Sequence, residues 1–162
     1  MKMTVKKIII LFACAAAILI ISSVVYSHCQ IPCGIYNDPM RFDMLNEEIA
    51  TIEKSMNSIN QLSAEAKPNM NQIVRWVENK DTHADAFSEI VTYYFMAQRV
   101  APVDKTDAAA YEKYLNKITL LHQMVVTSMK TKQGTDLAEV KKLTELTAAF
   151  KKAYTETAEQ KK

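Results

Sequence analysis

Apolar side chains recur at spacings of three and four residues along most of this chain, and this periodicity constrains its fold more than any other feature. From Leu45 the pattern runs through Ile49, Ile52, Met56 and Ile59. Such spacing places the apolar residues on one face of an α-helix. The chain has only two glycines in 162 residues and no alternating strand pattern, so it lacks the turns that a β-sandwich needs. We therefore expect an all-α fold.

Three further segments show the same pattern and are separated by turn signals. Pro68 opens the second, which should end before Pro102 because proline disfavours helical geometry in the residue before it. The third begins near Asp107, and Gly134 separates it from the fourth, for which Asp136 is the predicted cap. Their stripes are Ile73, Val77, Ala84, Phe87, Val91, Tyr94 and Gln98; Tyr111, Leu115, Ile118, Leu121, Val125 and Met129; and Leu137, Val140, Leu143, Phe150 and Tyr154.

The first helix is expected to begin with Asp38 as its cap and Pro39 at its first helical position. Helices of about 20–30 residues joined by short links pack most simply as an antiparallel up-down-up-down four-helix bundle. We assign residues 37–162 to this bundle. Its lysine-rich end, with Lys151, Lys152, Lys161 and Lys162, is predicted to be a solvated helix end.

The first 27 residues differ chemically from the rest and have the features of a secretory signal. Three lysines near the start precede an apolar run from Ile8 to Ile21, and small residues follow it. Val25 and Ser27 suit the −3 and −1 positions of a cleavage site, so signal peptidase is expected to cleave between Ser27 and His28. The protein would then be exported, to the periplasm or outside the cell. The alternative is an uncleaved membrane anchor, since the apolar stretch approaches the ~20 residues that span a bilayer.

Removing this segment changes the charge and the cysteine count. The whole chain has a formal charge of +2, from 20 basic and 18 acidic residues, but three of the lysines lie in the signal. The remaining 17 basic residues leave a formal charge of −1, which argues against a nucleic-acid partner. Cys14 also belongs to the signal, so two of the three cysteines stay in the mature chain.

Residues 28–36, His-Cys-Gln-Ile-Pro-Cys-Gly-Ile-Tyr, hold most of the possible chemistry. After cleavage the α-amine of His28 and the amide nitrogen of Cys29 would form one chelate ring, and the Cys29 thiolate would close a second. Cys33 can curl back to a fourth corner, with Pro32 stiffening the loop and Gly34 allowing a conformation that a β-carbon forbids. Two nitrogens and two sulfurs suit a square-planar metal, either Ni(II) or Cu(II), better than tetrahedral zinc.

The motif H-C-x-x-P-C-G-x-Y at a processed N-terminus resembles the nickel hook of nickel superoxide dismutases, whose subunits are also four-helix bundles. The resemblance implies one nickel ion per subunit, superoxide as substrate, and homohexamers. It implies that the amine of His28, the amide and thiolate of Cys29 and the thiolate of Cys33 are equatorial ligands. The His28 imidazole would be an axial ligand of the oxidised metal. We call residues 28–36 the hook.

The resemblance also assigns roles to two tyrosines. Tyr36 corresponds to the family's tyrosine that follows the hook and restricts access to small molecules. Tyr94 is similar to a second tyrosine that lines the same site from a helix, although a tyrosine on this stripe is equally consistent with an ordinary core residue.

The polar groups around the family's imidazole do not match this chain cleanly. In the family, a glutamate early in the first helix and an arginine on the second hold the imidazole. Glu47 or Glu48 could supply the carboxylate, and Lys80 is our substitute for the arginine. His83 and His122 have no ligand-spaced partners, so we expect neither to bind metal.

Two other functions remain open from the sequence. The chain could be an exported bundle that binds nickel or copper without catalysis, using the same ligands. It could also be a structural bundle in which Cys29 and Cys33 form a disulfide, which an oxidising compartment favours.

Overall fold

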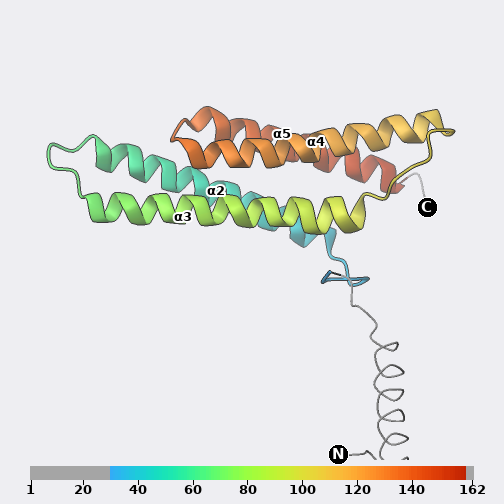
Figure 1. Ribbon diagram of the computed structural model, residues 1–162, viewed down its shortest axis with the longest axis horizontal. Coiled ribbons are helices and arrows are strands. Elements are labelled where there is room, and N and C mark those ends of the chain that lie inside the picture. The colour runs from blue at the N-terminus through green and yellow to red at the C-terminus, as the bar shows by residue number, and fades with distance from the viewer. Residues whose placement is uncertain (1–29, 160–162) are drawn as a thin grey trace, which may run out of the picture. The chain divides into compact units, whose positions relative to one another are not determined.

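The structure is a computed structural model that describes residues 30–159, and the regular structure of this part is entirely helical (Figure 1). The signal peptide predicted over residues 1–27, together with His28 and Cys29, lies outside the described residues. The elements are α2 (Asp38–Ser63), α3 (Met70–Glu89), η1 (Ile90–Arg99), α4 (Ala108–Gln133) and α5 (Leu137–Glu159). Since η1 continues α3 without a break, these elements form four rods, and the predicted all-α fold is confirmed.

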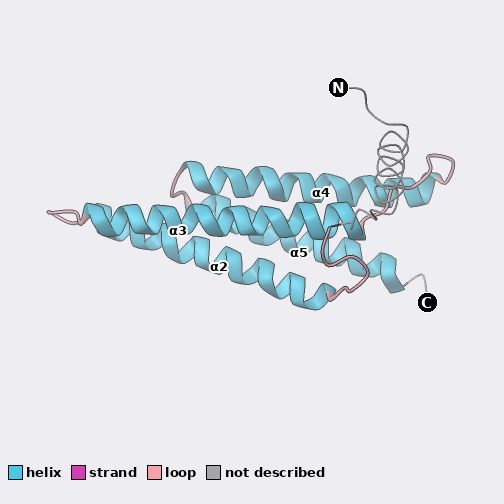
Figure 2. Cartoon of the chain, turned by 60° about the horizontal axis from the view of Figure 1, so that its bottom comes forward, coloured by secondary structure: helices cyan, strands magenta, loops and turns pink. Residues whose placement is uncertain are grey.

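Each rod packs against two others, which gives the predicted up-down-up-down bundle. Helix α2 lies against α3 and α5, and α4 lies against the same two helices (Figures 1 and 2). Near the start of α2, the core is aromatic: the ring centroid of Phe42 lies 4.8 Å from that of Phe95, which lies 5.1 Å from that of Phe150. The first predicted stripe is wholly buried, at Leu45, Ile49, Ile52, Met56 and Ile59.

Two helix starts differ from the prediction by one or two residues. Asn37, not Asp38, caps α2, and its side chain accepts a hydrogen bond from the backbone N–H of Met40 at 3.1 Å. Asn69, not Pro68, caps α3 in the same way. An asparagine side chain accepts from the first turn as well as an aspartate does, so the local sequence permits either start. At the other two starts, Asp107 and Asp136 accept from first-turn amides as predicted.

The second and third stripes are only partly buried. Val77 is 38% exposed, and much of the start of α3 is exposed as well. The reason is that the α2–α3 hairpin extends past the turn between α4 and α5 (Figure 1). The hydrogen bond from Asn60 to the carbonyl of Thr135 marks where that turn meets α2. On α4, Leu115 and Met129 are also exposed, whereas Leu121 of the same stripe is fully buried, so only part of the predicted stripe faces the core.

The last ten residues of the second rod form a π-helix, η1, which the sequence pattern did not predict. It ends with a hydrogen bond from the N–H of Val100 to the carbonyl of Phe95 at 2.9 Å, a spacing of five residues. In an α-helix, residues five apart point roughly 140° away from each other. The wider turn of a π-helix brings them closer to one face. This difference decides where Tyr94 and Arg99 point.

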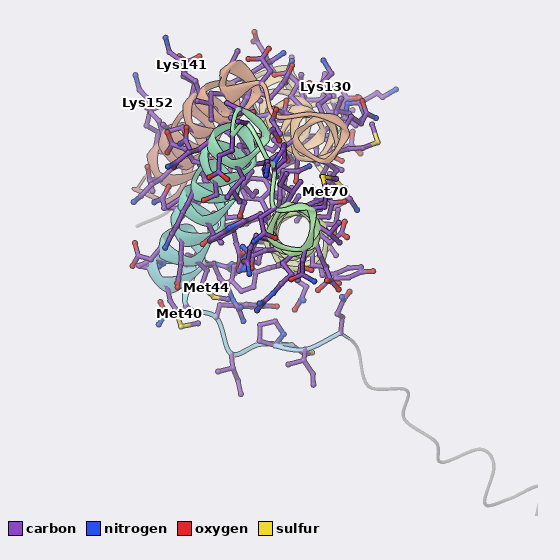
Figure 3. All side chains as sticks on the ribbon, turned by 90° about the vertical axis from the view of Figure 1, so that its left-hand side faces the viewer. Met40, Met44, Met70, Lys130, Lys141 and Lys152 are labelled. Carbon is purple, nitrogen blue, oxygen red and sulfur yellow. The ribbon has the colours of Figure 1, made fainter. Side chains whose placement is uncertain are left out.

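The surface follows the charge pattern. Lys141 and Lys152 of α5 point away from the bundle (Figure 3), and the exposed Lys152 agrees with the predicted solvated helix end. Lys161 and Lys162 lie outside the described residues. Among the helices of residues 30–159, none is long and apolar enough to cross a membrane.

Candidate metal centre

The described part of the hook is a tight turn that presents Cys33 to solvent. The N–H of Ile35 donates to the carbonyl of Pro32 at 2.8 Å, which makes Cys33 and Gly34 the two central residues of a β-turn. Gly34 has φ +84°, the left-handed value that the third position of a type II turn requires. The turn therefore depends on glycine, as predicted, and places the exposed Cys33 thiol at its corner.

Tyr36 fixes the end of this turn to the bundle. Its ring meets that of Tyr94 edge to face, with centroids 5.9 Å apart, and the guanidinium carbon of Arg99 lies 4.3 Å from the centre of the Tyr36 ring. Tyr36 is 39% exposed whereas Tyr94 is 4% exposed. Three residues of chain span at most about 11 Å, so Cys33 lies close to this aromatic pair. The structure thus brings Cys33, Tyr36 and Tyr94 together.

Asp38 is the centre of the polar contacts beneath Tyr36. Its Oδ1 accepts from the Tyr94 hydroxyl at 2.6 Å and from Arg99 Nε at 2.9 Å. Its Oδ2 accepts from Arg99 Nη2 and the Tyr154 hydroxyl, both at 2.7 Å. Two charge-assisted bonds to one guanidinium fix its plane as well as its position. We call Asp38, Tyr94, Arg99 and Tyr154 the Asp38 cluster.

The cluster holds its groups in definite protonation states. Burial acts to raise the pKa of Asp38, but the hydrogen bonds from Arg99, Tyr94 and Tyr154 outweigh it and keep that pKa below its usual value. Burial and the hydrogen bond to Asp38 raise the pKa of Tyr94 to about 12. The same two causes raise the pKa of Tyr154. At neutral pH the cluster therefore contains one carboxylate, one guanidinium and two protonated phenols.

A second guanidinium lies at this end of the bundle. The guanidinium carbon of Arg41 is 5.0 Å from the centre of the Tyr94 ring, and its Nη1 lies 3.4 Å from the sulfur of Met44. Figure 3 shows Met40 and Met44 where α2 begins, next to the segment that leads into it. The Nε atom of Arg41 is buried and finds no acceptor among residues 30–159. Two guanidinium groups thus lie beside Tyr94 and Tyr36, against the single carboxylate of Asp38.

The residues that we expected to hold the imidazole lie elsewhere. Lys80 is 2% exposed, and its Nζ donates to the carbonyls of Thr131 and Lys132, at 2.6 and 2.8 Å, and to Asp81. Lys80 therefore caps the C-terminal end of α4. It is 14 residues before Tyr94, which corresponds to roughly 20 Å of helix.

The two predicted carboxylates do not contact the tyrosines either. Oε2 of Glu48 lies 2.5 Å from Nδ1 of His83, and the Glu47 side chain is exposed. His122 is exposed, as expected of a surface residue.

Comparison with known families identifies the family of this chain. The family model described as nickel-containing superoxide dismutase matches residues 23–158. The chain belongs to this family. No curated protein and no solved structure gives a significant match to it.

Membership makes the protein a superoxide dismutase of the nickel type, an enzyme that contains nickel and acts on superoxide. The proposed donor among the described residues, the exposed thiol of Cys33, is a soft ligand and is compatible with nickel. Within residues 30–159 there is no group of three or more His, Cys, Asp or Glu side chains that would form a competing metal site.

The sequence predicted that Tyr36 and Tyr94 lie at one site, and the structure places their rings in contact, but the sequence did not reveal the Asp38 cluster. The sequence pattern indicated a helix cap at Asp38 and gave no role to Arg99. The signal that could have revealed them is the pair Asn37-Asp38, because an asparagine that caps the helix frees the aspartate after it for other partners.

Proposed function

We propose that the enzyme binds nickel at its processed N-terminus, through the amine of His28, the amide and thiolate of Cys29 and the thiolate of Cys33. The turn at Pro32–Ile35 supports this, because Gly34 allows the chain to reverse and leaves Cys33 accessible. The imidazole of His28 would supply a further nitrogen ligand. Cleavage after Ser27 is part of the proposal, since only a chain that begins at His28 has the α-amine as a donor.

Bound in the hook, nickel would supply one-electron transfer between Ni(II) and Ni(III), a change that thiolate and amidate donors make accessible. The overall reaction is 2 O2•− + 2 H+ → O2 + H2O2. The chain's own residues bind the substrate and control its access. Tyr36 and Tyr94 form a packed aromatic wall that restricts entry to small molecules. The guanidinium groups of Arg41 and Arg99 provide positive charge that attracts the superoxide anion.

Tyr94 takes part in this site as a neutral phenol. Its raised pKa and its donation to Asp38 keep the proton on its oxygen at neutral pH. Tyr94 therefore presents no phenolate, whose negative charge would repel superoxide.

Export and assembly complete the proposal. The signal at residues 1–27 would take the chain to the periplasm or outside the cell. A homohexamer with one nickel ion per subunit is the assembly that the family resemblance implies. Two large apolar side chains of the hook itself, Ile31 at 89% and Ile35 at 84% exposure, support burial of this segment by another subunit.

The test combines N-terminal sequencing with metal analysis of the mature protein. We expect a chain that begins at His28, contains one nickel ion and removes superoxide. One extra residue before His28, or Cys33→Ser, should abolish nickel binding and activity. Nickel binding with no removal of superoxide above buffer would instead indicate a metal-binding module. A metal-free chain two hydrogens lighter than calculated would indicate a Cys29–Cys33 disulfide.

A further inference from the structure

We propose that Asp38 is a positioning residue for both tyrosines of the site, and that Arg99 transmits its effect to Tyr36. Asp38 contacts Tyr94 directly, through a hydrogen bond of 2.6 Å. It reaches Tyr36 only through Arg99, which it binds with two hydrogen bonds and which stacks on the Tyr36 ring at 4.3 Å. One carboxylate thereby sets the positions of both rings at the hook.

The geometry argues against a purely local role for this carboxylate. A carboxylate in the first turn of a helix often serves as a cap, but Asn37 already caps α2, so both oxygens of Asp38 are free for distant partners. Four donor atoms from two other rods fill them: those of Tyr94 and Arg99 on η1, and that of Tyr154 on α5. The aspartate therefore connects the start of α2, the end of η1 and the end of α5 directly beneath Tyr36.

Each contact restricts a different motion of the groups at the site. The hydrogen bond from Tyr94 fixes the rotation of its hydroxyl, and the edge-to-face contact then limits where the Tyr36 ring can lie. The paired bonds to Arg99 fix the guanidinium plane, which the Tyr36 ring covers. Since Tyr36 is 39% exposed and follows Cys33 by three residues, these contacts keep it from moving into solvent.

The test reads the two rings separately, by fluorine NMR of protein that carries fluorotyrosine, with and without nickel. The signals are assigned with Tyr36→Phe and Tyr94→Phe. In Asp38→Asn we expect both signals to move toward their values in unfolded protein, although Tyr36 does not touch residue 38. The matched control is Asp43→Asn, an exposed aspartate on the same helix, which should move neither signal.

Two further variants separate transmission from general loosening. Arg99→Lys keeps the charge but loses the paired bonds and the flat stacking surface, so it should move the Tyr36 signal. Tyr154→Phe removes one donor to Asp38 and a hydrogen-bond partner of Arg99 but keeps both paired bonds between Asp38 and Arg99, so it should move the Tyr36 signal less than Asp38→Asn does. An unmoved Tyr36 signal in both Asp38→Asn and Arg99→Lys would overturn the proposal. A Tyr36 shift in Tyr154→Phe as large as that in Asp38→Asn would also overturn it.

The catalytic consequence rests on the proposed function. Per bound nickel, superoxide removal should fall about ten-fold in Asp38→Asn at unchanged nickel content, because misplaced groups near a reacting centre reduce the rate. Unchanged activity in a fully loaded Asp38→Asn variant would refute the role in catalysis. Protein that binds no nickel but shows the Tyr36 shift would refute the proposed function and support the positioning role of Asp38.

Discussion

Arg99 and Asp38, 61 residues apart in the chain, form a paired ion contact with Nε–Oδ1 and Nη2–Oδ2 distances of 2.9 and 2.7 Å. Both side chains are about three-quarters buried. The contact joins the last residue of η1 to the first residue of α2, immediately after the hook. The fold thus places a fixed charge pair just after the hook, the segment in which the sequence concentrates its chemistry.

Loss of the Asp38 charge should destabilise the fold in a pH-dependent way. We expect Asp38→Asn to lower the free energy of unfolding by about 2 kcal/mol at neutral pH, since hydrogen bonds to a charged group are lost. The folded-state pKa of Asp38 is lowered from 3.8, so its contribution is present above that value and is lost as the pH falls through the folded pKa. Urea unfolding of both proteins should show a difference that narrows in acid. A constant difference down to the lowest pH at which the protein folds would contradict this.

Tyr94 should ionise late in alkaline titration. Its pKa is raised to about 12 from 10.0, so the stability that it provides is complete below pH 10 and is lost as the pH rises through about 12. Phenolate absorbance of the folded protein, compared with Tyr94→Phe, isolates this group. In Asp38→Asn the Tyr94 midpoint should fall. A midpoint near 10 in the unaltered protein would show that the hydroxyl does not donate to a buried carboxylate.

The left-handed conformation of Gly34 should be needed for metal binding. The β-carbon that Gly34→Ala adds would meet no atom within 4 Å, so the substitution costs only backbone strain, about 1 kcal/mol. If the turn holds the ligands, nickel affinity should fall about five-fold, as measured by competition with a chelator. Gly134→Ala is the matched control, because that site is equally open and its φ is not positive. Equal nickel affinity in the two variants would argue against a role for the turn.

Lys80 should prove to be a stability residue. Lys80→Met removes three buried or half-buried hydrogen bonds and leaves carbonyls of Thr131 and Lys132 without this donor, so we expect a loss of about 2–4 kcal/mol in urea unfolding. Nickel content per folded chain should not change. The ammonium of Lys132 binds the exposed Asp85, so Lys132→Met should lower the free energy of unfolding by less than about 1 kcal/mol. A fall in activity per nickel in folded Lys80→Met would restore Lys80 as a residue of the site.

The helices and their order were predictable because their signals are local. Periodicity places Leu45, Ile52 and Met56 on a buried face, and caps such as Asp107 act within one turn of their own position. The predicted burial was wrong at Val77 and Leu115, because burial also depends on where a neighbouring helix ends. No local pattern records that position.

The sequence by itself determined the four helices, the order of residues in the hook and the glycine that its turn requires. Only the tertiary structure decided which polar groups surround that hook. Arg99 and Tyr94 both reach Asp38 because the second rod ends as a π-helix, and a helix of this kind brings residues five apart toward one face. The spacing of residues along the chain does not distinguish a π-helical turn from an α-helical one. The packing of η1 against α2 and α5 does distinguish them. The physical reason is the distance along the chain. The predicted ligands lie in one contiguous motif, whereas the contacts that support the hook join residues 56, 61 and 116 positions apart.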